Sequence, residues 1–112
     1  RIESSARMSQ AVVANGFVFL AGQVAPDPSS PDVENQTRQV LWEIDRLLAI
    51  AGTDKSKLLS ATIYLADVAD FAAMNRAWEQ WVAADGKPAR ATVEAKMVAP
   101  EYRVEIQVVA LV

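Results

Sequence analysis

An arginine and a glutamate near the C-terminal end are the residues of this chain best suited to chemistry. Arg90 lies in residues 87–96 and Glu105 in residues 102–112, and polar and apolar residues alternate in both segments. A period of two is typical of strands with one polar and one apolar face. If the two strands pair antiparallel about a turn at residues 97–98, Arg90 lies opposite Glu105 on the polar face.

Directly opposed side chains in such a pair have Cβ atoms about 5 Å apart. A guanidinium at that distance from a carboxylate could bind a small anion while the carboxylate activates a water. The same register sets Thr92 opposite Arg103. The alternative is a solvent-exposed cross-strand ion pair that contributes only about 0–1 kcal/mol to stability. The residues alone leave both interpretations open.

Composition narrows the chemistry that is open to the chain. Its 112 residues, 52% hydrophobic and 22% charged, predict one globular domain over residues 1–112. Cysteine and histidine are both absent, which excludes thiolate nucleophiles, imidazole bases and the usual zinc ligands. Chemistry must therefore depend on carboxylates, guanidinium groups, hydroxyls, the backbone and water, and we expect no metal.

Charge and hydropathy indicate which partners to expect. A net charge of −3 and a pI near 4.8 disfavour binding to phosphate backbones, which needs clustered Lys and Arg, so we expect no nucleic-acid partner. The apolar runs are far shorter than the roughly 20 residues of a membrane span, and no signal-peptide pattern opens the chain. We expect a soluble, cytoplasmic protein without a membrane partner.

The first half of the chain predicts a hairpin and a helix. Residues 1–8 are polar without periodicity, and we expect them to run extended over the surface. Asn15-Gly16 separates β-rich runs at 9–14 and 17–21, which is a strong hairpin signal because both residues tolerate positive φ. Apolar residues at helical spacing then predict a helix over 34–51, with Asp32 as its cap and Gly52 as its end.

The second half predicts a third strand and a second helix before the last two strands. The strand at 58–66 is expected to place four residues on one side: Leu59, Ala61, Ile63 and Leu65. Asp67 or Asp70 is expected to cap the helix that follows. That helix carries an apolar and aromatic stripe, which we assign to the core: Phe71, Met74, Trp78, Trp81 and Val82.

The predicted order is β-β-α-β-α-β-β, a two-layer α+β domain in which two helices pack on one face of a mixed sheet. Two helices cover only one face of five strands, yet several strands are apolar on both faces. Another copy of the chain is the simplest cover for the second face, so we expect a homo-oligomer.

Several short segments, taken in order, resemble the RidA family, also called YjgF/YER057c/UK114 or L-PSP. They run from Ser9 to the C-terminal strand: Ser9-Gln10-Ala11-Val12, Ala21-Gly22-Gln23-Val24, Gln36-Thr37, Asp70 to Asn75, Pro88 to Val93 and Val104-Glu105-Ile106. The resemblance implies a chorismate-mutase-like fold assembled as a homotrimer with sites at the subunit interfaces. It also implies hydrolysis, without cofactor or metal, of enamines and imines such as 2-aminoacrylate and 2-iminopropanoate to 2-oxo acids and ammonia.

The resemblance assigns roles to individual residues. Arg90, in its Pro-Ala-Arg context, matches the arginine that holds the substrate carboxylate, and Glu105 matches the glutamate that positions the water. Thr92 stands where the family commonly has cysteine and keeps the backbone carbonyl that faces the reacting centre. Asn75 matches a helix asparagine near the site, although it could equally be a hydrogen-bonded residue on the buried side of the helix. Gly22 belongs to the segment that lines the substrate.

Two other activities remain open on the sequence. A trimer could bind a small carboxylate through Arg90 without turning it over. Some relatives in the family are associated with ribonuclease activity or inhibition of translation, but the acidic balance and the lack of histidine and of a basic aromatic stripe disfavour this.

Two departures from the family pattern predict a changed substrate preference. Met8 replaces a tyrosine and Ala21 replaces a serine of the family pattern, so two hydroxyl donors are lost, each worth about 1 kcal/mol net. We expect a more apolar site that favours larger apolar imino acids. The measurement is the ranking of kcat/KM across small and large imino acids for wild type and the double variant Met8→Tyr/Ala21→Ser. An unchanged ranking would contradict this assignment.

Overall fold

Six strands form one mixed sheet in the computed structural model, which describes residues 1–112. The strands are β1 (Ile2–Ser4), β2 (Ser9–Ala14), β3 (Phe17–Leu20), β4 (Leu58–Leu65), β5 (Ala89–Glu94) and β6 (Val104–Leu111). Their order across the sheet is β1-β2-β3-β6-β4-β5. Every neighbouring pair is antiparallel except β4 and β5, which run parallel.

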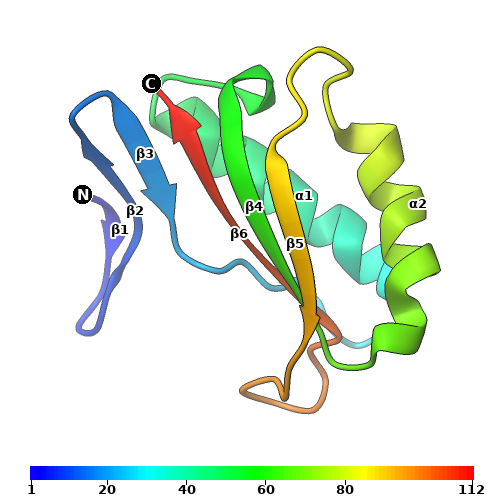
Figure 1. Ribbon diagram of the computed structural model, residues 1–112. Coiled ribbons are helices and arrows are strands. Elements are labelled where there is room, and N and C mark those ends of the chain that lie inside the picture. Colours follow the sequence, from blue (N-terminus) through cyan, green and yellow to red (C-terminus); the bar gives the residue numbers. More distant parts are fainter.

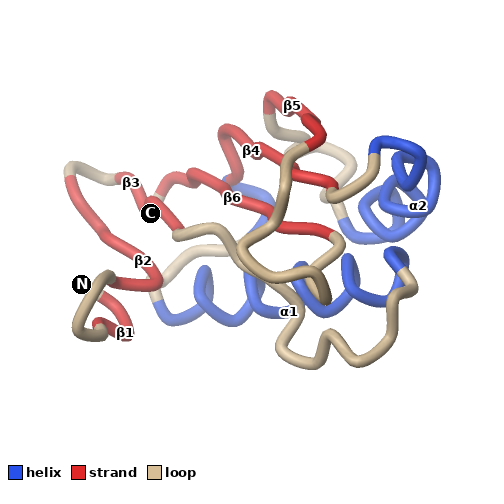
Figure 2. Tube along the Cα trace, turned by 90° about the horizontal axis from the view of Figure 1, so that it is seen from below, coloured by secondary structure: helices blue, strands red, loops and turns tan.

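Two helices form the second layer, α1 (Val33–Ile50) and α2 (Phe71–Trp81), with short 3₁₀ helices η1 (Lys55–Lys57) and η2 (Val68–Asp70) before β4 and α2. Figures 1 and 2 show α1 lying across one face of the sheet and α2 beside its β5 end. The two-layer α+β architecture predicted from the sequence is confirmed. Neither helix combines the length and apolar character needed to cross a bilayer.

Local signals in the sequence account for most element boundaries. Asn15 and Gly16 both have positive φ, +52° and +80°, as a two-residue hairpin turn requires. The Asp32 side chain accepts a hydrogen bond from the Glu34 amide at the start of α1. Asp67 caps η2, which leads into α2, whereas Asp70 makes no capping hydrogen bond.

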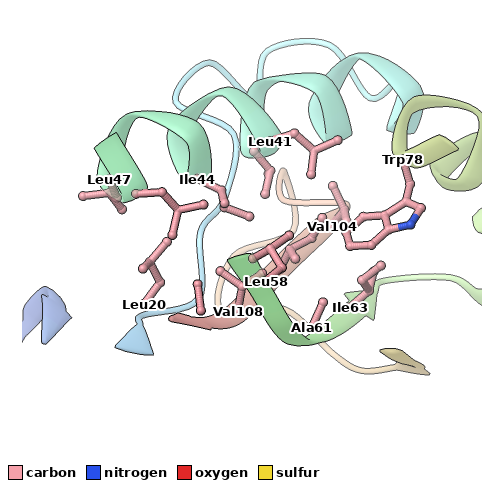
Figure 3. Packing of buried hydrophobic residues seen from close by; sticks show 14 of the residues in the cluster. Leu20, Leu41, Ile44, Leu47, Leu58, Ala61, Ile63, Trp78, Val104 and Val108 are labelled. Atoms are coloured by element: carbon pink, nitrogen blue, oxygen red, sulfur yellow. The ribbon is translucent and has the colours of Figure 1, made fainter. Parts of the chain in front are cut away.

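The core lies between α1 and the face of the sheet that α1 covers (Figure 3). Leu41, Ile44 and Leu47 of α1 are at most 2% exposed. They face residues of alternating positions on the strands, among them Leu20, Ile63, Val104 and Val108. The apolar stripe of α1 therefore packs on one face of the sheet, as the spacing of its apolar residues at 3.6 per turn predicts.

Two strand details differ from expectation. Residues 1–8 contain the short edge strand β1, paired with β2, and Arg46 of α1 binds both carboxylate oxygens of Glu3 at 2.6 and 3.1 Å. In β4 a register shift between Leu58 and Ser60 turns Leu58 into the core and leaves Leu59 40% exposed. One extra residue at this point of β4 shifts the alternation of inward and outward side chains by one position. A prediction based on a strict period of two cannot include such a shift.

The antiparallel pairing expected between the last two strands is wrong. β4 lies between β5 and β6, pairing parallel with one and antiparallel with the other. Arg90 is therefore aligned with Ala61 of β4, Glu105 with Tyr64, and neither Arg90 nor Thr92 lies opposite a residue of β6. A helix between two strands favours a parallel crossover, and β4-α2-β5 is such a unit.

The sheet face away from the helices is partly apolar and open. Strand register places four exposed apolar residues on it: Phe17 and Phe19 of β3, Val93 of β5 and Leu111 of β6. Each is between 37% and 46% exposed. We call this surface the open face.

Candidate functional site

Arg90 lies on the helix side of the sheet, at the edge strand β5. Its strand partner is Ala61, which is 2% exposed under the helices, so the Arg90 side chain points toward α2. There Nη1 of Arg90 donates a hydrogen bond of 2.8 Å to Oδ1 of Asn75. This hydrogen bond orients the guanidinium between the sheet edge and α2.

Two aromatic rings of α2 approach the same guanidinium. Cζ of Arg90 lies 5.8 Å from the ring centre of Phe71 and 5.3 Å from that of Trp78. Burial lowers the pKa of Arg90 below its ordinary value, opposed by the charge of Glu79. The guanidinium nevertheless stays charged at neutral pH, because arginine does not deprotonate in proteins.

Most donors of Arg90 have no acceptor within the chain. Nη1 binds Asn75, whereas Nε and Nη2 bind no protein group. These two nitrogens form the edge of a guanidinium that matches the two oxygens of a carboxylate. Arg90 is thus partly desolvated, oriented, and free to bind an anionic group.

Glu105 lies on the open face, in a different environment. It is half-buried and aligned with Tyr64 of β4. It borders a hollow of about 390 Å³ whose other lining residues are Gly22, Tyr64, Ala95, Lys96, Met97, Val98 and Gln107. A carboxylate at the wall of an open hollow of this size can hold a water beside a small ligand.

The segment after β3 fits closely against Glu105. A Cβ on Gly22 would overlap Oε2 of Glu105 and lie 2.9 Å from its Cδ. Gln23 holds this segment in place by backbone hydrogen bonds with Ile106, 2.9 and 3.1 Å long, and by side-chain hydrogen bonds to the Ala21 carbonyl and to Gln10. The absence of a side chain at Gly22 leaves the space that the Glu105 carboxylate occupies.

The loop between β5 and β6, residues 95–103, forms the other wall of the hollow and is anchored by a buried glutamine. Nε2 of Gln36 on α1 donates to the carbonyls of Ser30 and Glu101, at 2.8 and 3.0 Å. Its Oε1 accepts a hydrogen bond of 2.9 Å from the Arg103 amide. Gln36 is fully buried, so one side chain ties this loop to the helix layer.

Arg90 and Glu105 do not meet within one chain. Side chains alternate between faces along a strand. On β4, Ala61 and Ile63 face the helices and Tyr64 faces the open side, so Arg90 points to one side of the sheet and Glu105 to the other. A single copy of the chain therefore presents the guanidinium of Arg90 on one face and the hollow bordered by Glu105 on the other.

The other expected site residues are spread between these two places. Asn75 is half-buried and binds Arg90, and Thr92 shares the helix side with Arg90. Ala21 precedes Gly22, and its amide donates to the Gln10 carbonyl at 2.8 Å. Met8 is 46% exposed in the turn before β2 and does not line the hollow of its own chain.

Sequence reasoning assigned two residues near Arg90 only to the core. Phe71 and Trp78 contact the guanidinium, and Phe71 is 43% exposed. The signal that could have found them is spacing, since Phe71, Asn75 and Trp78 are related as i, i+4 and i+7 and so share one face of a helix. The presence of Asn75 between two aromatic residues on this helix face indicates that the face is not purely a core-packing one.

Gly22→Ala is expected to move the Glu105 carboxylate without unfolding the chain. Gly22 does not have the positive φ that only glycine readily adopts, and the overlapping atoms belong to the end of a flexible side chain. We expect a cost of about 1–2 kcal/mol in the free energy of unfolding. Glu105→Ala should remove most of that cost in the double variant, measured by urea denaturation of all four proteins. The same cost in both backgrounds would show that Gly22 is not required by Glu105.

Thr92→Val is expected to stabilise the protein. Oγ1 of Thr92 is buried and has no hydrogen-bond partner, and a buried hydroxyl without a partner costs stability relative to a methyl group of similar shape. The free energy of unfolding should rise by about 1 kcal/mol. Thr62→Val, at a half-buried position on the open face, is the control and should change it less. A less stable Thr92→Val protein would mean that the hydroxyl is bonded after all.

Comparison with known proteins identifies the family of the chain. The family model described as endoribonuclease L-PSP matches residues 1–112. A RutC family protein from Haemophilus ducreyi is 47% identical over 112 residues, which cover all of this chain and 95% of the relative.

Two solved structures show the same fold. A YjgF-family protein from Neisseria meningitidis is 48% identical, with a TM-score of 0.94 over 97% of this chain and 90% of the other. A protein of the conserved Rid family from Yersinia pestis is 34% identical, with a TM-score of 0.90 over the same shares. On the match of the whole chain to the family model and on these identities, the chain belongs to the endoribonuclease L-PSP family, the group also called YjgF, RutC or Rid.

Proposed function

We propose that this protein hydrolyses reactive 2-imino acids, and the enamines in equilibrium with them, to 2-oxo acids and ammonia. Arg90 binds the substrate carboxylate and Glu105 orients the attacking water. Each site forms between two copies of the chain, in a homotrimer. The observation that carries the proposal is the oriented guanidinium of Arg90, whose Nε and Nη2 have no acceptor within the chain.

The reaction needs few groups, and this chain offers them. Water adds to the imine carbon of R–C(=NH)–COO⁻ while the carboxylate of Glu105 takes one of its protons. The imine nitrogen takes up that proton, which gives the carbinolamine R–C(OH)(NH2)–COO⁻. Glu105 then passes the proton of its hydroxyl group to the nitrogen, the C–N bond breaks as the C=O bond forms, and ammonia leaves with the 2-oxo acid as the other product. A general base and a clamp on the substrate carboxylate suffice for these steps.

Two copies are needed because Arg90 and Glu105 lie on opposite sides of one sheet. The open face carries Phe17, Phe19, Val93 and Leu111, each more than a third exposed. A second copy packed there would bury apolar surface and could bring its own edge strand β5 to the hollow beside Glu105. This supports the trimer with interfacial sites that the resemblance to the RidA family implies.

Ribonuclease activity, which the description of the family model names, fits this chain less well. The net charge is −3, and the chain has no histidine to act as an imidazole base. Binding of a polyanion depends on clustered positive charge. The arginine at the site is suited instead to a single carboxylate.

Subunit complementation tests the activity and the assembly together. Imines are generated from amino acids by an amino-acid oxidase and trapped with semicarbazide, and loss of the imine is followed. Arg90→Ala and Glu105→Gln should each lower kcat/KM on the order of 100-fold, since each removes a charged hydrogen-bonding group. An equal mixture of the two, unfolded and refolded together, should recover about a quarter of wild-type activity, because about three-quarters of the trimers are mixed and each of these has one intact site of three.

The controls separate the possible failures. Refolding of each variant alone should restore no activity, and native mass spectrometry should report the mixed trimers. Mixed trimers without recovery would contradict a site shared between subunits. A wild-type trimer that binds 2-oxo acids but accelerates no imine hydrolysis would instead make the protein a carboxylate-binding member of the family.

A further inference from the structure

The guanidinium of Arg90 is held by aromatic rings as well as by a hydrogen bond. We propose that Phe71 and Trp78 are positioning residues for carboxylate binding: they hold the Arg90 guanidinium between their rings so that its Nε and Nη2 face the ligand. We call this arrangement the aromatic cradle of Arg90. The proposal rests on the function proposed above, in which Arg90 binds the substrate carboxylate.

Three residues of α2 act on the guanidinium from one helix face. Phe71 and Trp78 place their ring centres 5.8 and 5.3 Å from Cζ, within the range of cation–π attraction. Asn75 lies between them on the same face and accepts the Nη1 hydrogen bond at 2.8 Å. The rings contact the guanidinium without using any of its N–H donors, so the remaining donors stay free for a ligand.

The cradle restricts the rotamers and the hydration of the Arg90 side chain before a ligand binds. An arginine side chain loses considerable rotamer freedom when it binds, and fixing it beforehand reduces that loss. The rings also remove water from the guanidinium, consistent with the lowered pKa of Arg90 through burial. Partial desolvation strengthens the attraction to a carboxylate. Both effects act on affinity and not on the attack of water.

The same geometry explains why lysine should not replace Arg90. A lysine ammonium is a compact, strongly hydrated point charge and lacks a planar fork of donors. It could approach the rings, as Lys55 approaches Trp81, but it could not present two parallel donors to a carboxylate. We therefore expect Arg90→Lys to lose most of the binding even though the charge is kept.

Phe71 is the member of the cradle that can be changed cleanly. It is 43% exposed, whereas Trp78 is 6% exposed and belongs to the hydrophobic core. Phe71→Leu keeps an apolar side chain and removes the ring, while Phe71→Tyr keeps the ring and is the matched control. Phe71→Tyr keeps the ring and adds only a hydroxyl, so a loss shared by both variants would arise with the ring still in place and would count against the cradle.

The experiment measures ligand affinity and turnover in the intact trimer. Titration calorimetry with 2-oxobutanoate gives Kd, and the semicarbazide assay gives KM and kcat. For Phe71→Leu we expect Kd and KM to rise roughly 3- to 10-fold, with kcat within about twofold, and for Phe71→Tyr values near wild type. Wild-type affinity in Phe71→Leu, or equal weakening in both variants, would overturn the cradle while leaving the proposed function intact.

A spectroscopic measurement tests the orientation itself. The side-chain Hε resonance of Arg90 should be shifted by the ring currents of the cradle in wild type and in Phe71→Tyr, and should move toward the position of a free arginine in Phe71→Leu. An Hε resonance that is unchanged by loss of the ring would contradict the cradle. A wild-type protein that neither binds 2-oxobutanoate nor hydrolyses imines would refute the proposed function itself, and this outcome is distinct from the other two.

Discussion

The position of β4 between β5 and β6 is the constraint on which the rest of the candidate site depends. It results from the parallel crossover β4-α2-β5, in which the helix covers one face and delivers the chain to the sheet edge. With β4 in the middle, Arg90 and Glu105 fall on opposite faces. The chemistry proposed for this chain is then a property of an assembly, because one copy cannot apply both groups to one small molecule.

The two halves of the site are built by different means. Arg90 is placed by a helix: Asn75 supplies a hydrogen bond, and two rings supply flat apolar walls. Glu105 is placed by backbone, since the chain around Gly22 approaches so closely that a side chain there would occupy the carboxylate's space. An oriented cation needs contacts on several sides, whereas a carboxylate that works with water needs an open hollow beside it.

Buried amides connect these local arrangements to the core. The side chain of Gln36 ties the loop before β6 to α1. Gln23 ties the segment after β3 to β6 by its backbone and to Gln10 of β2 by its side chain. Both side chains are at most 7% exposed, and both amide groups are hydrogen-bonded. Burying such groups is tolerated only with their partners in place. The walls of the hollow are therefore fixed by the same packing that holds the fold together.

Local patterns in the sequence predicted both α-helices and every strand except β1. The Asn15-Gly16 turn, the Asp32 cap and the apolar stripe of α1 are each determined by a few neighbouring residues, and the structure confirms all three. Residue types and their order were also sufficient for the fold class and the family, and they singled out Arg90 and Glu105 as candidates. Such features depend on backbone preference and on a single period, which can be read along the chain.

The tertiary structure alone decided which strands are neighbours, and with that which side of the sheet each candidate faces. Alternation marks a strand but does not identify its partner, and the sequence led to an antiparallel turn between β5 and β6 in place of the parallel crossover through α2. The bulge in β4 was not predicted for the same reason. One extra residue in a strand reverses which face the neighbouring side chains point to, and nothing in the residue types of the strand indicates it. Strand order depends on which pairing buries the most apolar surface with the helices in place. The apolar surface that each strand order buries depends on the whole chain, so it cannot be determined from any single segment of the sequence.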